Sequence, residues 1–388
     1  MSVQPRRRAD LSVFLLAMSI RVEQIDLYHI RMSLVSPFET SFGVTTERES
    51  IIVRVLAEGL AGWGECVADA APGYSYETVT TAWHILRDYL APALLRAPLD
   101  DPRDAPAHFR FVRGHNMAKA TLEAPLWDIA AQQAGQSLAR YIGGVRDRVL
   151  VGVSIGIQSS PDKLAEVARG YCEAGYRRIK IKIKPGRDLA DVRAVRRAIG
   201  DTPLMVDANS AYTLDDASLF QQMDEFGLLM IEQPLGYDDI YQHHKLQRQL
   251  NTPLCLDESI HSADDARFAL EIGACRIINI KQGRVGGMTN AIAVHDVCRQ
   301  AGAPVWCGGM LETGIGRAFN LALATLPNFT LPGDLSASSR YYRLDLIDPP
   351  FELNSDSTLS VPTMPGLGVN VLQDRLDAVT LRHDVLRP

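Results

Sequence analysis

The sequence lacks the features that mark several specialised protein classes. It has only 6 cysteines in 388 residues, with no Cys-x-x-Cys pair and no spacing typical of zinc ligands, which disfavours a disulfide scaffold or a zinc finger. Its apolar runs are all shorter than the roughly 18 residues of a membrane span. The net charge is only −6, so we expect no nucleic acid and no membrane as partners.

What the sequence does contain is typical of a large globular protein. Hydrophobic residues make up 46% and charged residues 22% of the chain, with 29 glycines and 21 prolines. The length indicates two domains, or one barrel with additions.

The N-terminal segment has a weak secretory pattern. Arg6-Arg7-Arg8 precede an apolar stretch from Leu11 to Ile20, and Ala17-Met18-Ser19 is an acceptable small-x-small cleavage site. We prefer to interpret residues 1–21 as a short extension that leads into the first strand, and we expect the protein to be cytoplasmic.

The first third of the chain predicts strands followed by helices. Residues 25–32 alternate, residues 36–43 are rich in turn formers and residues 50–56 are rich in β-branched side chains, which together predict an antiparallel pair. Helical patterns follow over residues 76–95, 105–113 and 117–134, the last with an apolar stripe near the 3.6-residue period.

After about Val149, short apolar runs alternate with helix-length segments. Continuous apolar runs of this kind indicate buried parallel strands joined by helices. Seven or eight such units in about 190 residues favour a (β/α) barrel over an open sheet. The runs are Leu150–Ile155, Arg178–Ile183, Leu204–Val206, Leu228–Ile231, Leu254–Leu256, Ile277–Ile280 and Val305–Trp306.

A charged residue ends five consecutive runs. The residues are Lys182, Asp207, Glu232, Asp257 and Lys281. Their spacings are 207 − 182 = 25, 232 − 207 = 25, 257 − 232 = 25 and 281 − 257 = 24. Since the carboxyl ends of barrel strands meet at one mouth, where catalytic residues normally lie, we expect all five in one cleft.

The order of these charges favours metal-assisted proton transfer. Three crowded carboxylates would raise one another's pKa unless a cation lies among them, and oxygen ligands suit Mg²⁺, with Mn²⁺ as an alternative. A lysine on each side could move a proton next to a substrate carboxylate, while the cation stabilises the enediolate. Lys180 shares the inward phase of Lys182, which is costly without an anionic ligand.

Three other interpretations compete with this one. Each carboxylate alone could be a solvated helix cap. A lysine could form a Schiff base, as in aldolases, with no metal required. A non-catalytic binding module is also possible in principle, but it predicts lost ligands, whereas all five positions are intact.

Longer motifs around these residues resemble the enolase superfamily and, within it, the muconate-lactonizing-enzyme subgroup. The similarity extends over nearly all of residues 22–375. Within the subgroup, the sequence most resembles the N-succinylamino acid racemase and o-succinylbenzoate synthase family. The motifs are Arg178-Ile-Lys-Ile-Lys, Val206-Asp-Ala-Asn209, Ile231-Glu-Gln-Pro234, Leu256-Asp-Glu-Ser259, Asn279-Ile-Lys-Gln-Gly-Arg-Val-Gly-Gly287, Trp306-Cys-Gly-Gly-Met-Leu-Glu-Thr-Gly-Ile-Gly316 and Asn328-Phe-Thr-Leu-Pro-Gly-Asp334.

The resemblance implies a fold and a set of roles. It implies a (β/α)7β modified TIM barrel at residues 148–345 and an α+β capping domain from residues 22–147 and 346–388, in a homo-oligomer. It makes Asp207, Glu232 and Asp257 the Mg²⁺ ligands and Lys182 and Lys281 the acid–base pair. The substrate-binding positions that it implies are Lys180, Asn209, Ser154, Asn279, Gly309, Met310, Leu311, Phe38 and Tyr74.

The sequence leaves the roles of two further residues open. Arg284 could depress the pKa of Lys281, or it could be a surface arginine. Asp69 stands where relatives usually carry an apolar pocket residue. If it faces the pocket, it favours a cationic or polar substrate side chain, and if it faces water it carries no function.

The activity that the resemblance favours is racemisation of N-acylated amino acids, N-succinyl ones first. The alternative is o-succinylbenzoate synthesis, a dehydration in menaquinone biosynthesis, and both would act on a small carboxylate substrate. A muconate cycloisomerase is less favoured, as is a dipeptide epimerase. Epimerase relatives carry an acidic pair near the last strand, where this chain reads Gly308-Gly309-Met310.

Overall fold

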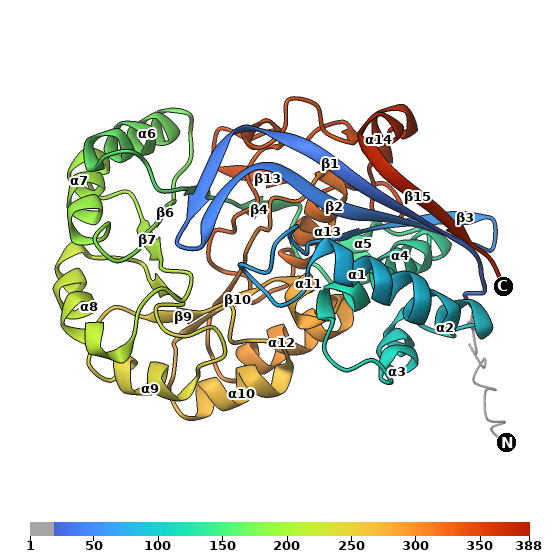
Figure 1. Ribbon diagram of the computed structural model, residues 1–388, viewed down its shortest axis with the longest axis horizontal. Helices are drawn as coiled ribbons and strands as arrows, with labels where there is room; N and C mark the ends of the chain where they lie inside the picture. The colour runs from blue at the N-terminus through green and yellow to red at the C-terminus, as the bar shows by residue number, and fades with distance from the viewer. Residues whose placement is uncertain (1–18) are drawn as a thin grey trace, which may run out of the picture.

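The computed structural model describes residues 19–388, so the interpretation of residues 1–18 as part of an N-terminal extension lies outside the described residues. Two sheets dominate the structure, one parallel and one antiparallel (Figure 1). Across residues 19–388, no helix combines the length and apolar character needed to span a membrane.

The parallel sheet has seven strands in the order β11-β10-β9-β8-β7-β6-β5, and every neighbouring pair is parallel. Its strands coincide with the predicted apolar runs, because both faces are buried. Their bounds are β5 Val153–Ile155, β6 Ile179–Lys182, β7 Leu204–Asp207, β8 Ile231–Glu232, β9 Leu254–Leu256, β10 Ile277–Ile280 and β11 Val305–Cys307.

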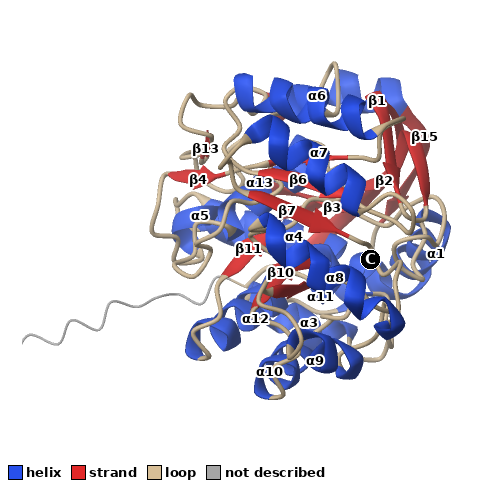
Figure 2. Ribbon diagram, turned by 90° about the vertical axis from the view of Figure 1, so that its left-hand side faces the viewer, coloured by secondary structure: helices blue, strands red, loops and turns tan. Residues whose placement is uncertain are grey.

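Helices cover the outside of these strands (Figure 2). They have apolar inner faces and, in several cases, a serine or threonine at the N-cap. They are α6 Pro161–Glu173, α7 Leu189–Ile199, α8 Ala217–Met223, α9 Tyr241–Gln247, α10 Ala263–Glu271, α11 Gln282–Val285, α12 Met288–Gln300 and α13 Gly314–Leu323.

Residues 329–334 lie between the two ends of this sheet. Phe329 forms a parallel bridge with Val305 of β11, and Gly333 forms one with Val151, just before β5. The Asp334 amide donates to the carbonyl of Cys307 at 2.9 Å. This segment takes the place of an eighth strand, and the predicted modified TIM barrel is confirmed.

The antiparallel sheet has the order β15-β1-β2-β3 and packs with helices of the first third of the chain. Its strands are β1 Val22–Thr40, β2 Gly43–Ala57, β3 Leu60–Cys66 and β15 Thr380–Leu386. The helices are α1 Val79–Ile85, α2 Ala91–Arg96, α3 Ala105–Phe109, α4 Asn116–Gln133 and α5 Leu138–Tyr141. The C-terminal strand thus joins the N-terminal block, whereas the exact domain boundaries stay predictions.

The turn predicted over residues 36–43 is wrong in extent. Both strands continue through it, with a register shift between Ser33 and Phe38, and only Ser41 and Phe42 form the turn. Proline at position 37 is tolerated because the irregularity removes the need for a regular ladder there. As a result, the hairpin reaches the barrel, where the Ser41 hydroxyl donates to the carbonyl of Asn209 at 3.2 Å (Figure 1).

Two buried carboxylates of the capping layer bind helix N-termini of the barrel. Glu65 of β3 accepts from the amide of Thr313 at 3.0 Å and from that of Gly316 at 2.9 Å, at the start of α13. Glu123 of α4 accepts from the amide of Thr289, at the start of α12, at 2.9 Å. Free amides and the helix dipole both favour an acid at these ends.

We expect the contribution of Glu65 to stability to depend on pH. Burial raises the pKa of Glu65 from 4.5 to about 7, against the opposing hydrogen bonds from Thr313. The folded state therefore holds a proton that the unfolded state releases, and this stability is complete below about pH 4.5 and lost as the pH rises through about 7. The difference in melting temperature between the wild type and Glu65→Gln should therefore be larger at pH 5 than at pH 8.

Calorimetry at both pH values measures this difference. The matched control is Glu173→Gln, which makes the same change at an exposed helix position. An equal pH trend in both variants would contradict the assignment to Glu65.

Candidate active site

The five predicted strand-end charges come together at one end of the barrel. Lys182 pairs with Asp207 in the ladder between β6 and β7, and Asp207 pairs with Glu232 between β7 and β8. Asp257 and Lys281 directly follow β9 and β10. All five side chains are buried, so each charge depends on protein partners.

Lys180 and Lys182 share the carboxylate of Asp207 on one side of the site, as the strand alternation predicts. Lys182 Nζ lies 2.6 Å from Asp207 Oδ2 and 2.7 Å from Asn209 Oδ1. Lys180 Nζ lies 3.1 Å from the same Asp207 oxygen and 2.9 Å from Glu232 Oε2. One carboxylate therefore sets the separation of two ammonium groups.

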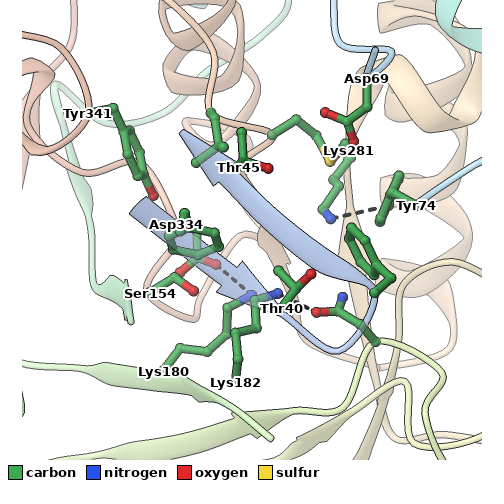
Figure 3. A pocket seen from close by; sticks show the side chains of 16 residues that line it. Thr40, Thr45, Asp69, Tyr74, Ser154, Lys180, Lys182, Lys281, Asp334 and Tyr341 are labelled. Carbon is green, nitrogen blue, oxygen red and sulfur yellow. Dashed lines mark hydrogen bonds and ion pairs between the residues drawn. The ribbon is translucent and has the colours of Figure 1, made fainter. Parts of the chain in front are cut away.

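Lys281 lies on the other side with partners of its own. Its Nζ is 2.7 Å from Asp257 Oδ2 and 3.1 Å from the Tyr74 hydroxyl, which in turn donates to Asp257 Oδ1 at 3.0 Å. Arg284 also pairs with Asp257, and it is only 4% exposed, so the interpretation as a surface arginine is wrong. Figure 3 shows Lys182 and Lys281 reaching the cavity from different directions.

A cavity of about 600 Å³, including the part open to solvent, lies above these lysines. Every predicted substrate-binding position except Asn279 lines it, whereas the three carboxylates are not among the lining residues and instead contact the lysines. Asn279 is buried and donates to Glu232 Oε1 at 2.8 Å. The predicted lining residues are Phe38, Tyr74, Ser154, Lys180, Asn209, Gly309, Met310 and Leu311, with Lys182 and Lys281 beside them.

Several lining residues were not predicted from the sequence. Asp334 comes from residues 329–334, which close the barrel and are called the closing segment below, and Tyr341 comes from the loop after it. Thr40, Phe42 and Thr45 come from the hairpin. Asp334 carries a signal that could have found it, because the strand-end spacing continues from Lys281 with 307 − 281 = 26 and 334 − 307 = 27. The hairpin residues carry no such signal, since the pattern around them predicts a turn.

The two flanking lysines differ in acidity. Burial lowers the pKa of Lys182 below its ordinary value, and the neighbouring Asp207 offsets only part of this effect. Burial would also lower the pKa of Lys281, but Tyr74 and Glu232 raise it above the ordinary value. Lys182 is therefore the better base of the two, and Lys281 is the better holder of a proton.

The carboxylates have unlike acidities as well. Burial would raise the pKa of Asp207, yet the ammonium groups of Lys182 and Lys180 hold it well below its usual range. For Glu232, burial and the nearby Asp207 raise the pKa. The charge of Glu232 is therefore less fully compensated than that of Asp207, and a further cation beside it would favour its ionised form.

The acidic residues suit a hard divalent cation. In the described part of the chain, no three His, Cys, Asp or Glu side chains form a compact ligand group, and each strand-end carboxylate is paired with a lysine. However, the carboxylates of Asp207, Glu232 and Asp257 supply only oxygen atoms, and Glu258 Oε2 nearby is buried with no hydrogen-bond partner. This donor set fits Mg²⁺ or Mn²⁺.

Asp69 faces the cavity. It lies among the lining residues, and its Oδ1 pairs with the guanidinium of Arg48, which is only 3% exposed. The buried cation compensates the charge of Asp69 but leaves its other oxygen free to accept a hydrogen bond. The interpretation of Asp69 as facing only water is therefore wrong.

Comparison with known families agrees with this geometry. Residues 163–375 match the family described as Enolase C-terminal domain-like, and residues 24–143 match the Mandelate racemase / muconate lactonizing enzyme, N-terminal domain. The chain belongs to the enolase superfamily. The resemblance to its muconate-lactonizing-enzyme subgroup is confirmed, and with it that the protein is an enzyme.

Individual enolase-superfamily relatives match over almost their whole length. An o-succinylbenzoate synthase of Geobacillus kaustophilus is 52% identical over 94% of this chain and 97% of its own. An N-succinylamino acid racemase of Amycolatopsis sp. is 50% identical over 93% of this chain and 98% of its own. The crystal structure of an enolase-superfamily member from Listeria innocua superposes with a TM-score of 0.91 at 40% identity, over 95% of this chain and 99% of that one.

Membership of the enolase superfamily also bears on the competing interpretations. It implies a divalent metal, usually Mg²⁺. The Schiff-base aldolase and the binding module, which need no such metal, therefore give way to metal-assisted chemistry.

Proposed function

We propose that this protein is a divalent-cation-dependent racemase of N-acylated amino acids, N-succinyl ones first. The observation that carries the proposal is the pair of buried lysines, Lys182 and Lys281, which reach one cavity from different directions. Two proton-transferring groups on opposite sides of a carbon atom are what inversion at that carbon requires.

The floor of the cavity suits a substrate carboxylate. Asp207, Glu232 and Asp257 are the residues that would hold the cation, which when bound supplies Lewis-acid stabilisation of negative charge on the substrate. Lys180 would add an ammonium group beside that charge, and it stays protonated because Asp334 and Glu232 raise its pKa although burial opposes them. The substrate α-carbon would then lie between the flanking lysines.

Proton transfer follows from the different acidities of these lysines. Lys182 would remove the α-proton at its Nζ, because burial favours its neutral form. Lys281 would give a proton to the opposite face, since Tyr74 and Glu232 favour its charged form. In the reverse direction the two lysines exchange roles.

o-Succinylbenzoate synthesis is the second candidate. It is supported by the 52% identity to a relative with that name. In this reaction one lysine would serve as base and then as acid, while the other stays cationic. A dipeptide epimerase is less well supported, because Asp334, the acid that the closing segment brings to the cavity, is already paired with Arg178 and Lys180 rather than free for a substrate ammonium.

Hydrogen–deuterium exchange tests the assignment of the two lysines. In D₂O with Mg²⁺, the wild type should racemise N-succinyl-phenylalanine and exchange the α-proton of both enantiomers. Lys182→Ala and Lys281→Ala should each abolish racemisation, and each should still exchange one enantiomer, a different one in each variant. NMR and chiral chromatography measure both events.

The control for this test is Lys184→Ala, which removes a lysine that is paired with Glu39 outside the cavity lining. Exchange of both enantiomers by either single variant would contradict the two-base assignment. If the wild type is silent here but dehydrates the hydroxylated cyclohexadiene precursor to o-succinylbenzoate, the second candidate is the function.

Removal of the metal should abolish activity. We expect EDTA to stop turnover, and Mg²⁺ or Mn²⁺ to restore it. Asp207→Asn and Glu232→Gln should weaken Mg²⁺ binding in calorimetry by more than the roughly 10- to 100-fold that loss of an outer-shell partner costs. The control is Asp224→Asn, since Asp224 does not line the cavity and accepts from the amides of Asn251 and Thr252, before β9 begins. Undiminished turnover in EDTA would contradict the metal-dependent reaction.

Asp69 should tune the preference for the substrate side chain. Its free oxygen can accept a hydrogen bond, so we expect Asp69→Leu to lower kcat/KM for N-succinyl-lysine relative to N-succinyl-phenylalanine by about tenfold, the value of one good hydrogen bond. Asp69→Asn, which can still bond to Arg48, separates this effect from disruption of the buried pair. An unchanged ratio in both variants would show that Asp69 does not contact the side chain.

A further inference from the structure

Three cationic side chains point into the barrel from consecutive alternate positions. Arg178 directly precedes β6, and Lys180 and Lys182 lie within it, so the two-residue period of a strand places all three on the inner face. Arg178 is 0% exposed and Lys180 3%. Like charges stacked in this way need anions between them.

Carboxylates fill both gaps of this column. In the lower gap, Asp334 Oδ1 lies 2.7 Å from Arg178 Nη1, and its Oδ2 lies 2.6 Å from Lys180 Nζ. In the upper gap, Asp207 Oδ2 contacts Lys180 Nζ and Lys182 Nζ. Figure 3 shows the contact between Asp334 and Lys180 at the floor of the cavity. Charges thus alternate in sign from the barrel interior to the proposed base.

The lower end of the column is fixed by packing. Arg178 Nη2 donates to the carbonyl of Pro332 at 2.9 Å, and its guanidinium carbon lies 5.6 Å from the centroid of the Trp306 ring. Gly152 leaves room for it, because a Cβ there would lie 2.4 Å from the guanidinium carbon. Asp334 is held in turn by the hydrogen bond that its backbone N–H donates to the carbonyl of Cys307.

Lys180 therefore has three carboxylate neighbours with different duties. Asp207 and Glu232 are the proposed metal ligands, whereas Asp334 is outside that set and lies nearest to the ammonium group. Without Asp334, the flexible lysine would have only the two ligands as partners and would compete with the cation for them. With Asp334 as a fixed partner of the Lys180 ammonium group, Asp207 and Glu232 remain available to the cation.

We infer that Arg178 and Asp334 are positioning residues that hold the ammonium group of Lys180 at the cavity floor for the substrate carboxylate. The inference rests on the proposed function, which places Lys180 beside that carboxylate. Arg178 acts through Asp334, and Asp334 acts through Lys180.

A double-mutant cycle tests the inference. We expect Asp334→Asn to raise KM for N-succinyl-phenylalanine about 10- to 100-fold with a smaller change in kcat, as loss of a charge-assisted contact to a binding group would do. In a Lys180→Met background, the same substitution should change kcat/KM by no more than about twofold. The calorimetric Kd of N-succinylglycine, which is achiral, should follow the same pattern.

A merely structural role gives a different result. If Asp334 only stabilises the barrel, the fold losses in kcat/KM of Asp334→Asn and Lys180→Met multiply in the double variant, and that outcome would overturn the inference. An unchanged KM in Asp334→Asn would overturn it as well. The control is Asp128→Asn, which removes an equally buried carboxylate in the capping layer that accepts from Trp63 and Leu367. It should leave KM and kcat within about twofold.

A second variant guards against misfolding. Asp334→Asn leaves the Arg178 cation buried and unpaired. Arg178→Met/Asp334→Leu removes both charges, and a protein loses less stability when both partners of a buried ion pair are replaced than when one is. It should raise KM as Asp334→Asn does. If the wild type neither turns over nor binds N-succinyl substrates, the cycle is run on the o-succinylbenzoate precursor. Inactivity on both overturns the proposed function and this inference together, whereas an active wild type with multiplicative losses overturns the inference alone.

Discussion

The structure depends on the balance of buried charge inside the barrel. Lys180, Lys182 and Lys281 are all less than a tenth exposed, and so are the acids that face them. Isolated, each of these ions would cost several kcal/mol of desolvation, and only the near contact of opposite signs makes the arrangement tolerable. The short strands make these contacts possible, because they bring a charge from each of five consecutive repeats to the same end of the barrel.

The same balance explains why the site lies between two layers. The barrel supplies the charges and part of the cavity wall, and the rest of the wall comes from the hairpin that ends β1 and starts β2 and from the loop that carries Asp69 and Tyr74. Tyr74 contacts Lys281 and Asp257 directly, so the capping layer also takes part in the electrostatics of the barrel. Glu65 and Glu123 fix this layer by binding helix N-termini beneath it.

The barrel was predictable from the sequence because its signals are local and repeated. Buried parallel strands are apolar on both faces, and a charge at or just after the end of five of these seven strands recurs about every 25 residues. The capping sheet was less predictable. β3 follows β2 after a turn of only two residues and reads as part of a glycine-containing loop, and β15 pairs with a strand at the opposite end of the chain. Asp334 stands in a quoted motif but was not predicted as a site residue, because it follows a segment joined to its neighbours by single bridges rather than a regular ladder.

The pairing of β15 with β1 has a consequence for the order in which the protein is made. The two strands are separated by 380 − 40 = 340 residues, and every strand of the barrel is encoded between them. A ribosome therefore finishes the barrel before it makes the last strand of the sheet above the cavity. The hairpin that walls the mouth is made before the barrel, and only the edge strand β15 comes last, so during synthesis one edge of β1 stays open while β2 pairs with the other.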